Sequence, residues 1–205
     1  MVNHFNKSKS QKKIVVAMDS FKGSLTSMEA GNAVRDGILE QYPDVDVQIF
    51  PVADGGEGTV EALTFGKEHV QTRTISVTGP VGTEVLAGYT IYEQAGEKTA
   101  VLEMAQAAGL PFVPEERRNP MHTTTYGVGE MIRDAITCGC RKFILGIGGS
   151  ATNDAGIGML QALGYHFLDA IGREVDYGAE GLAQVRSITT EDVMPELASC
   201  TFQIA

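Results

Sequence analysis

Residues 142–160, KFILGIGGSATNDAGIGML, begin as an apolar run, pass through a glycine-rich polar bend and resume with small and apolar residues at helical spacing. Gly146, Gly148 and Ala151 fit the G-x-G-x-x-G/A dinucleotide pattern, and Asp169 lies close to where a ribose-binding acid is expected. Three interpretations are open at this point: a dinucleotide fingerprint, a kinase loop or a plain tight turn.

Strand-like and helix-like segments alternate before this stretch. Residues 13–19 (KIVVAMD) favour a strand, and residues 26–43 favour a helix that Pro43 ends. Residues 45–54 favour a second strand, and a short helix through TVEALTFG follows. This order predicts the start of a parallel sheet covered by helices.

Between residues 72 and 104 the alternation of strands and helices gives way to three strand-like runs, separated by GPVG and QAGE turns. This pattern is typical of an antiparallel meander. A helix from about Thr125 to Thr137 then leads into the strand KFILGI, and another helix is expected near 155–164. The chain stops at CTFQIA, an apolar strand-like run that we expect at a sheet edge, where it would invite self-association.

These segments predict an α/β fold with two parts. Residues 13–71 are expected to form part of a parallel, nucleotide-binding-like (Rossmann-like) domain, and residues 72–205 a second α/β domain with a mixed sheet, incomplete at its C-terminus. Residues 1–12, polar and basic, are expected to be a flexible lead.

Composition excludes several function classes. The 205 residues include 26 acidic and 16 basic side chains, a net charge of −10, which disfavours nucleic acid and anionic membrane surfaces as partners. The three cysteines contain one close pair, C-G-C, which fits neither a disulfide framework nor a zinc site. Reduced thiols and the absence of a long apolar stretch predict a cytoplasmic protein.

Two loops before the meander are candidates for ligand binding. In DSFKGSLTS (19–27), Lys22, Gly23 and Ser24 stand between a strand and a helix start, where an anion is favoured; the alternative is a capping box of Thr26 and Glu29. In DGGEG (54–58), glycines let a ligand approach the backbone beside two carboxylates. Its alternative is a helix cap of the D-x-x-E type.

The third loop is the opening stretch, where Ser150, Thr152, Asn153 and Asp154 are expected at a helix entrance. Four polar groups there suit a hydroxyl, a phosphate or a metal better than a pyrophosphate held by backbone alone. The pattern also follows the meander, whereas a dinucleotide fingerprint usually lies in the first βαβ unit. The sequence contains no G-x-x-x-x-G-K-[ST], which excludes a P-loop.

Four motifs, MDSFKGSLTS, PVADGGEGT, TTTYGVGEMI and GIGGSATNDAGIGMLQALG, occur in the order and approximate spacing seen in type I glycerate kinases, and the sequence resembles that family from Lys13 to its last residue. The resemblance implies ATP-dependent phosphorylation of D-glycerate to phosphoglycerate by two α/β domains that face each other across a cleft. Members of that family are about twice as long, so the chain looks like an N-terminal half that is not expected to act efficiently alone.

The chemistry of phosphoryl transfer indicates which types of residue the site needs. Mg²⁺ and lysine neutralise the phosphates of ATP, while a carboxylate accepts the proton of the attacking hydroxyl. The catalytic candidates are Asp19, Lys22 and Asp154, with Lys22 as the leading phosphate contact; which acid is base and which binds metal is left open, as is the phosphorylated position. The substrate- or nucleotide-binding candidates are Ser20, Gly23, Ser24, Asp54, Gly55, Gly56, Glu57, Gly148, Gly149, Ser150, Thr152 and Asn153.

Two rival functions remain. One is an NAD(P)-dependent oxidoreductase that uses the bend from Gly146 to Ala151 together with Asp169. The other is a non-catalytic fragment that needs a missing half.

Overall fold

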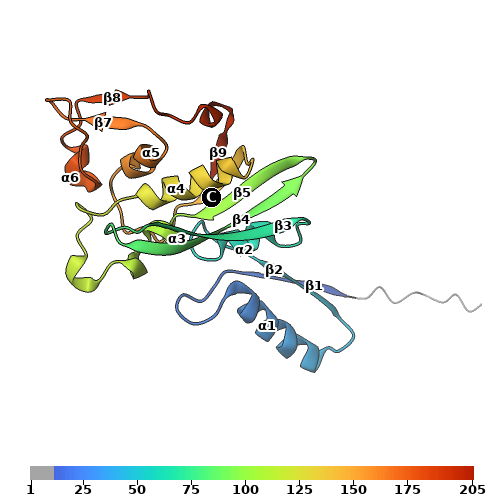
Figure 1. The fold of residues 1–205 in the computed structure, drawn as a ribbon. Coiled ribbons are helices and arrows are strands. Elements are labelled where there is room, and N and C mark those ends of the chain that lie inside the picture. Colours follow the sequence, from blue (N-terminus) through green and yellow to red (C-terminus); the bar gives the residue numbers. More distant parts are fainter. Residues whose placement is uncertain (1–11) are drawn as a thin grey trace, which may run out of the picture. The chain divides into compact units, whose positions relative to one another are not determined.

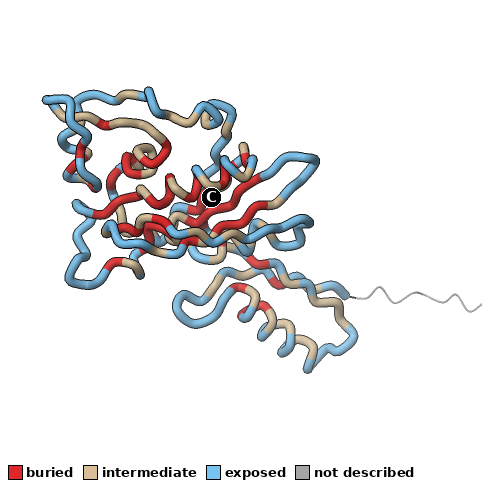
Figure 2. Tube along the Cα trace, viewed as in Figure 1, coloured by how far each residue is buried: buried red, intermediate tan, exposed pale blue. Residues whose placement is uncertain are grey.

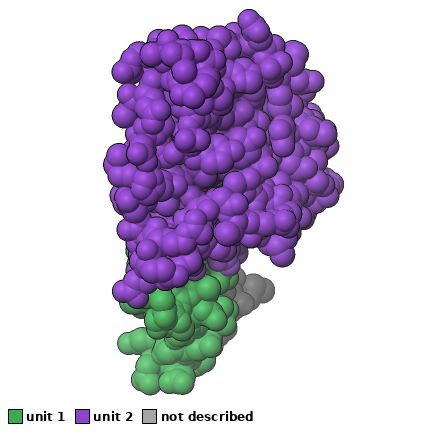
Figure 3. All heavy atoms as spheres, turned by 60° about the vertical axis from the view of Figure 1, so that its left-hand side comes forward, with its two compact units in different colours: residues 1–53 green, residues 54–205 purple. Residues whose placement is uncertain are grey.

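The computed structural model describes residues 12–205, so all but the last residue of the lead expected at 1–12 lies outside the described residues. The chain divides into two compact units, one that ends at Ala53 and one that starts at Asp54 (Figure 3). Each unit is described separately below.

The first unit is a β-α-β element. Strand β1 (Lys13–Met18) is followed by helix α1 (Ser27–Gln41) and strand β2 (Asp46–Pro51), and the two strands pair in parallel (Figure 1). The helix lies close to β2, because a Cβ at Gly31 would come within 2.5 Å of Ile49 Cγ2. The parallel, helix-covered start expected from the sequence is confirmed.

The second unit contains a five-stranded mixed sheet in the order β3-β4-β5-β6-β9. The pairs β3-β4 and β4-β5 are antiparallel, and the pairs β5-β6 and β6-β9 are parallel. The predicted meander and mixed sheet are therefore confirmed, and CTFQIA supplies the edge strand. The strands are β3 (Val70–Thr78), β4 (Glu84–Gln94), β5 (Glu97–Glu103), β6 (Lys142–Gly146) and β9 (Thr201–Ile204).

Helices of this unit include the two expected from the sequence, α4 (Tyr126–Thr137) and α5 (Ile157–Ala162). A small antiparallel hairpin of β7 (His166–Leu168) and β8 (Ser187–Thr189) follows α5. The remaining helical segments are α2 (Thr59–Thr64), α3 (Ala105–Ala108), α6 (Gly178–Leu182) and three 3₁₀ turns, η1 (Leu110–Phe112), η2 (Glu115–Arg117) and η3 (Pro195–Ser199).

The core of the second unit lies between α4 and the sheet (Figure 2). Met131 and Ile132 of α4 are buried together with Tyr89, Leu102 and Phe143 of three neighbouring strands. Burial of large apolar side chains of this kind is the main source of folding free energy. The core therefore fixes the central strands β5 and β6, and two of the loops considered next meet at the carboxyl ends of these strands.

Helix α2 packs against β4 and β5 and so lies in the second unit. The division between Ala53 and Asp54 thus falls earlier in the chain than the domain boundary expected at residues 71/72. Within residues 12–205, no helix combines the length and the apolar character that crossing a bilayer requires.

Candidate active site

Two of the three predicted loops meet at the carboxyl ends of β5 and β6. These strands run in parallel, with Glu103 opposite Gly146. The amide nitrogen of Gly148 donates to the carbonyl oxygen of Gly55 at 2.8 Å, and that of Met104 donates to Gly146 at 2.8 Å. Because ligands of α/β proteins bind beyond the carboxyl ends of parallel strands, this paired-loop region, residues 54–58 with 146–154, is the candidate site.

Close approach of the two loops explains their glycines. A Cβ at Gly146 would lie 2.6 Å from the carbonyl oxygen of Gly55, and a Cβ at Gly148 would lie 2.6 Å from the Cα of Gly56. Gly55 also has a φ of +92°, a conformation that side chains disfavour. The G-x-G pattern therefore serves contact between the loops, which needs no dinucleotide.

The dinucleotide interpretation fails on two further points. A fingerprint requires a helix directly after the bend so that its N-terminus meets the pyrophosphate, but α5 begins only at Ile157. The Asp169 carboxylate accepts hydrogen bonds from the amides of Ile171 and Arg173 and from the Arg173 guanidinium, within a local turn. These groups do not form a ribose-binding arrangement.

The loop 54–58 does not use its acids as helix caps. The N-cap of α2 is Gly58, with a φ of +90° and no side-chain cap, so the D-x-x-E capping alternative is wrong. Asp54 Oδ1 accepts only a long bond from the amide of Gly56, at 3.3 Å. The side chains of Asp54 and Glu57 are exposed and available to a ligand.

Asp154 lies in the interior of the third loop, with 1% of its surface exposed. Its Oδ2 accepts hydrogen bonds from the amide of Thr125 at 2.9 Å, the hydroxyl of Thr125 at 2.8 Å and the amide of Gly158 at 3.3 Å. Its Oδ1 accepts one from the amide of Gly156 at 3.0 Å. The carboxylate thus joins the start of α5 to the start of α4.

The motif TTTYG was recognised in the sequence, but its threonines were not predicted as site residues. Thr123, Thr124 and Thr125 are all buried. The hydroxyl of Thr123 donates to the carbonyl of Ala151 at 2.8 Å, and the hydroxyl oxygen of Thr125 accepts from the amide of Met159 at 2.9 Å. Three consecutive hydroxyl residues before a helix were the available signal.

These bonds occupy the first amides of α5, so the groups left for a ligand precede the helix. The hydroxyls of Ser150 and Thr152 lie 2.7 Å apart, and the amide of Thr152 donates to Ser150 Oγ at 3.1 Å. Asn153 is exposed, and its side chain has no hydrogen-bond partner among residues 12–205. Gly149 has a φ of +72° and is also exposed.

A second residue that the sequence reading missed is Glu103, at the end of β5. It is 6% exposed, and its Oε1 accepts a hydrogen bond from the amide of Val60 in α2 at 2.9 Å. The only signal for Glu103 in the sequence was its position as an acid at the end of the apolar run TAVLE.

The first loop, residues 19–25, belongs to the first unit. Asp19 Oδ1 accepts from the amide of Ser20 at 2.6 Å, and a tight turn from Phe21 to Leu25 contains Gly23 with a φ of +71°. Lys22 and Ser24 are exposed on this turn. The capping box of Thr26 and Glu29 is confirmed, but it begins after the turn and leaves Lys22 without an ion-pair partner in the described part of the chain.

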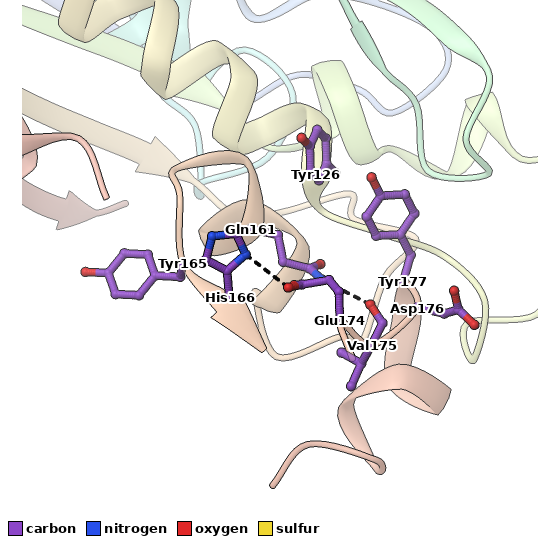
Figure 4. A pocket seen from close by; sticks show the side chains of 8 residues that line it. All are labelled: Tyr126, Gln161, Tyr165, His166, Glu174, Val175, Asp176 and Tyr177. Carbon is purple, nitrogen blue, oxygen red and sulfur yellow. Dashed lines mark hydrogen bonds and ion pairs between the residues drawn. The ribbon is translucent and has the colours of Figure 1, made fainter. Parts of the chain in front are cut away.

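A separate pocket of about 520 Å³ is lined by residues of α4, α5 and β7 and by the segment 174–177 (Figure 4). In it His166 contacts the carboxylates of Glu174 at 3.1 Å and Asp192 at 2.8 Å. The hydrogen bond to Asp192, and then that to Glu174, raise the pKa of His166. The pocket residues are Tyr126, Gln161, Tyr165, His166, Glu174, Val175, Asp176 and Tyr177.

The described residues contain no group of three or more His, Cys, Asp or Glu side chains placed to hold a metal ion. The exposed carboxylates of Asp19, Asp54 and Glu57 nevertheless carry the oxygen ligands that Mg²⁺ prefers.

Comparison with known proteins agrees with the loop motifs. The model of the glycerate kinase family matches residues 14–205. The chain belongs to the glycerate kinase family. It is 44% identical over 195 residues to a glycerate kinase of Haemophilus influenzae and 45% identical over 193 residues to glycerate 2-kinase of Escherichia coli, covering 94% of this chain and 50% of each relative.

The family fold is also seen in a solved structure, a protein of Salmonella typhimurium LT2 assigned as glycerate kinase 2. It superposes with a TM-score of 0.81 at 43% identity, over 95% of this chain and 52% of that one. The chain therefore has the α/β fold of this family, and it spans about half the length of the curated glycerate kinases it matches.

Proposed function

We propose that this chain carries part of the active site of an ATP-dependent glycerate kinase, which transfers the γ-phosphoryl group of ATP to a hydroxyl of D-glycerate. The observation that carries the proposal is the paired-loop region at the ends of β5 and β6, with Gly148 bonded to Gly55. The exposed side chains of Glu57 and Asn153 belong to the same two loops.

The loops offer what phosphoryl transfer requires, which is positioning and charge compensation. Exposed backbone at Gly149, with the side chains of Ser150, Thr152 and Asn153, suits the hydroxyl and carboxylate groups of a sugar acid. Lys22 supplies a positive charge for a phosphate; the neighbouring candidates Ser20, Gly23 and Ser24 would contribute polar groups beside it.

Burial alters the role that we assign to Asp154. Both of its oxygens are occupied by Thr125, Gly156 and Gly158, so we propose that it positions the loop and does not accept the substrate proton. The proton acceptor is then one of the exposed acids Asp19, Asp54 and Glu57.

Mg²⁺ bound with the nucleotide would neutralise the phosphate charge. Such an ion is usually held by one or two carboxylates together with the phosphates, which fits isolated exposed acids better than a closed cage. The candidate ligands are Asp19 in the first unit and, separately, Asp54 and Glu57 in the second unit.

The proposal also covers the cellular location, the substrates and the domains of the enzyme. We propose a cytoplasmic enzyme with small-molecule substrates, since the net charge of −10 does not favour nucleic acid or anionic membranes. Its two domains would form around residues 13–71 and 72–205.

The test is a coupled assay of ADP release. The 205-residue chain and an extended protein, in which this chain is joined to the remaining half of the Haemophilus influenzae glycerate kinase, are assayed with MgATP. ADP release that requires D-glycerate is expected from the extended protein. A folded extended protein that binds neither D-glycerate nor MgATP by calorimetry and releases no ADP would contradict the proposal.

A further inference from the structure

Glu103 is a buried acid that the proposed reaction does not use. Within residues 12–205 it has no ion-pair partner, and its Oε2 has no hydrogen-bond partner, while Oε1 accepts from the amide of Val60 at 2.9 Å. Oε2 is not among the fully buried atoms, so the desolvation cost falls mainly on Oε1, and the bond from the amide of Val60 offsets that cost. This interaction is with the first turn of α2.

This turn has no cap of its own. Gly58, the N-cap residue, provides no side-chain acceptor, so the amide of Val60 depends on Glu103 from strand β5. The hydroxyl of Thr59 in the same turn donates to the carbonyl of Gly56 at 2.7 Å. Holding the turn therefore also holds the glycine loop 54–58 that precedes it.

The loop in turn contacts its partner loop. Gly55 accepts from the amide of Gly148, and Gly146 lies directly opposite Glu103 in the β5-β6 register. A Cβ at Gly146 would lie 3.3 Å from the Cβ of Thr59, which shows how closely the turn approaches β6. Contacts thus run from Glu103 through the first turn of α2 to Gly148.

We infer that Glu103 is a positioning residue, which holds loop 54–58 against loop 146–149 through the amide of Val60; its importance for catalysis rests on the function proposed above. What matters is the reach of the side chain, because the amide needs an acceptor and not a charge. The interaction also occupies the amide of Val60, which is then not available to a phosphate.

Two conservative variants of Glu103 test whether the interaction requires the length of the side chain or its charge. Glu103→Gln keeps an oxygen acceptor at the same length and removes the charge, whereas Glu103→Asp keeps the charge and shortens the side chain. Glu130→Asp is the matched control, because Glu130 Oε2 accepts from the amide of Thr78 at 2.6 Å outside the paired loops.

The first readout is amide hydrogen exchange by NMR on the 205-residue chain. Glu103→Asp is expected to speed exchange at Val60 and Gly148 by about tenfold or more, and Glu103→Gln to leave both close to wild type. Glu130→Asp should affect Thr78 and leave Gly148 unchanged. Unchanged protection of Gly148 in Glu103→Asp would overturn the inference.

The second readout is the kinetics of the extended protein. Glu103→Asp should lower kcat/KM for D-glycerate, and Glu103→Gln should restore it. Loss of activity in Glu103→Gln with normal protection at Gly148 would mean that the charge itself acts on the ligand, which contradicts a positioning role. Absence of activity in every protein, wild type included, would count against the proposed function, while the exchange data still decide whether Glu103 holds the loops.

Discussion

The amide of Gly148 donates to the carbonyl of Gly55 at 2.8 Å, and this bond joins two loops that are far apart in the sequence. Loop 146–149 follows β6, and loop 54–58 leads into α2, which packs against β5, the strand that pairs with β6 in parallel. Side chains at both residues are absent, so the two backbones can touch.

Gly148→Ala is expected to separate these loops. The added Cβ would lie 2.6 Å from the Cα of Gly56, and such overpacking should lower the free energy of unfolding by about 1–3 kcal/mol. Urea denaturation measures the change. Gly88→Ala is the control, since its Cβ would meet only ordinary contacts at 3.8 Å, and it should cause no loss. Equal stabilities of the two variants would refute close loop packing.

Asp154→Ala should destabilise the protein as well as reduce turnover. It leaves the buried amide and hydroxyl of Thr125 without their acceptor, which should cost about 3 kcal/mol of unfolding free energy. A double-mutant cycle with Thr125→Val should show coupling between the two sites. Asp176→Ala, at an exposed acid, should change stability by less than about 0.5 kcal/mol. An Asp154→Ala variant of normal stability that lacks turnover would instead point to a direct catalytic role.

Lys22→Ala should lower kcat/KM of the extended protein by about 100-fold, the scale seen when a group that stabilises transition-state charge is removed. Stability should hardly change, because Lys22 is exposed. Steady-state kinetics with MgATP and D-glycerate give the ratio, and Lys12→Ala controls for the loss of a surface charge. A ratio near one would place Lys22 outside the site.

His166 should make the β7-β8 hairpin sensitive to pH. Its pKa is raised by Asp192 and Glu174, so the interaction is complete below the ordinary imidazole pKa of about 6.5 and is lost as pH rises through the raised pKa. NMR titration of the His166 ring should give a value above that of an isolated histidine, and Asp192→Asn should lower it. The protection factors of the hairpin amides, which correct for the intrinsic rise of exchange with pH, should fall over the same pH range, and His166→Gln should abolish this fall.

Edge strand β9 should promote self-association. In the described part of the chain it pairs with β6 alone, and Phe202 and Ile204 are 42% and 63% exposed. Light scattering of the 205-residue chain should show association that rises with concentration and that Ile204→Lys reduces. Ile171→Lys, at an isoleucine in a turn that is 72% exposed, should not reduce it. A wild-type chain that stays monomeric at high concentration would exclude this role for β9.

Local pattern was sufficient for most elements. The strand-like runs and turns of residues 72–104 predicted the strands β3, β4 and β5, and the helix expected from about Thr125 to Thr137 matches α4 almost to the residue. Glycines and short polar runs likewise located the three loops, because turn residues act within a few positions of the chain. The capping box of Thr26 and Glu29 is a similar local signal.

The sequence by itself thus determined the order of the main strands and helices up to α5, the positions of the glycine loops and, through four motifs, the family, whereas α3, α6 and the β7-β8 hairpin were not predicted. Only the tertiary structure decided that loop 54–58 contacts loop 146–149, that Asp154 is buried, and that Glu103 accepts a hydrogen bond from the first turn of α2. Each of these depends on contacts between segments that are distant in the chain. A sequence pattern indicates which side chains can be buried or hydrogen-bonded, whereas the tertiary packing decides which of them contact one another.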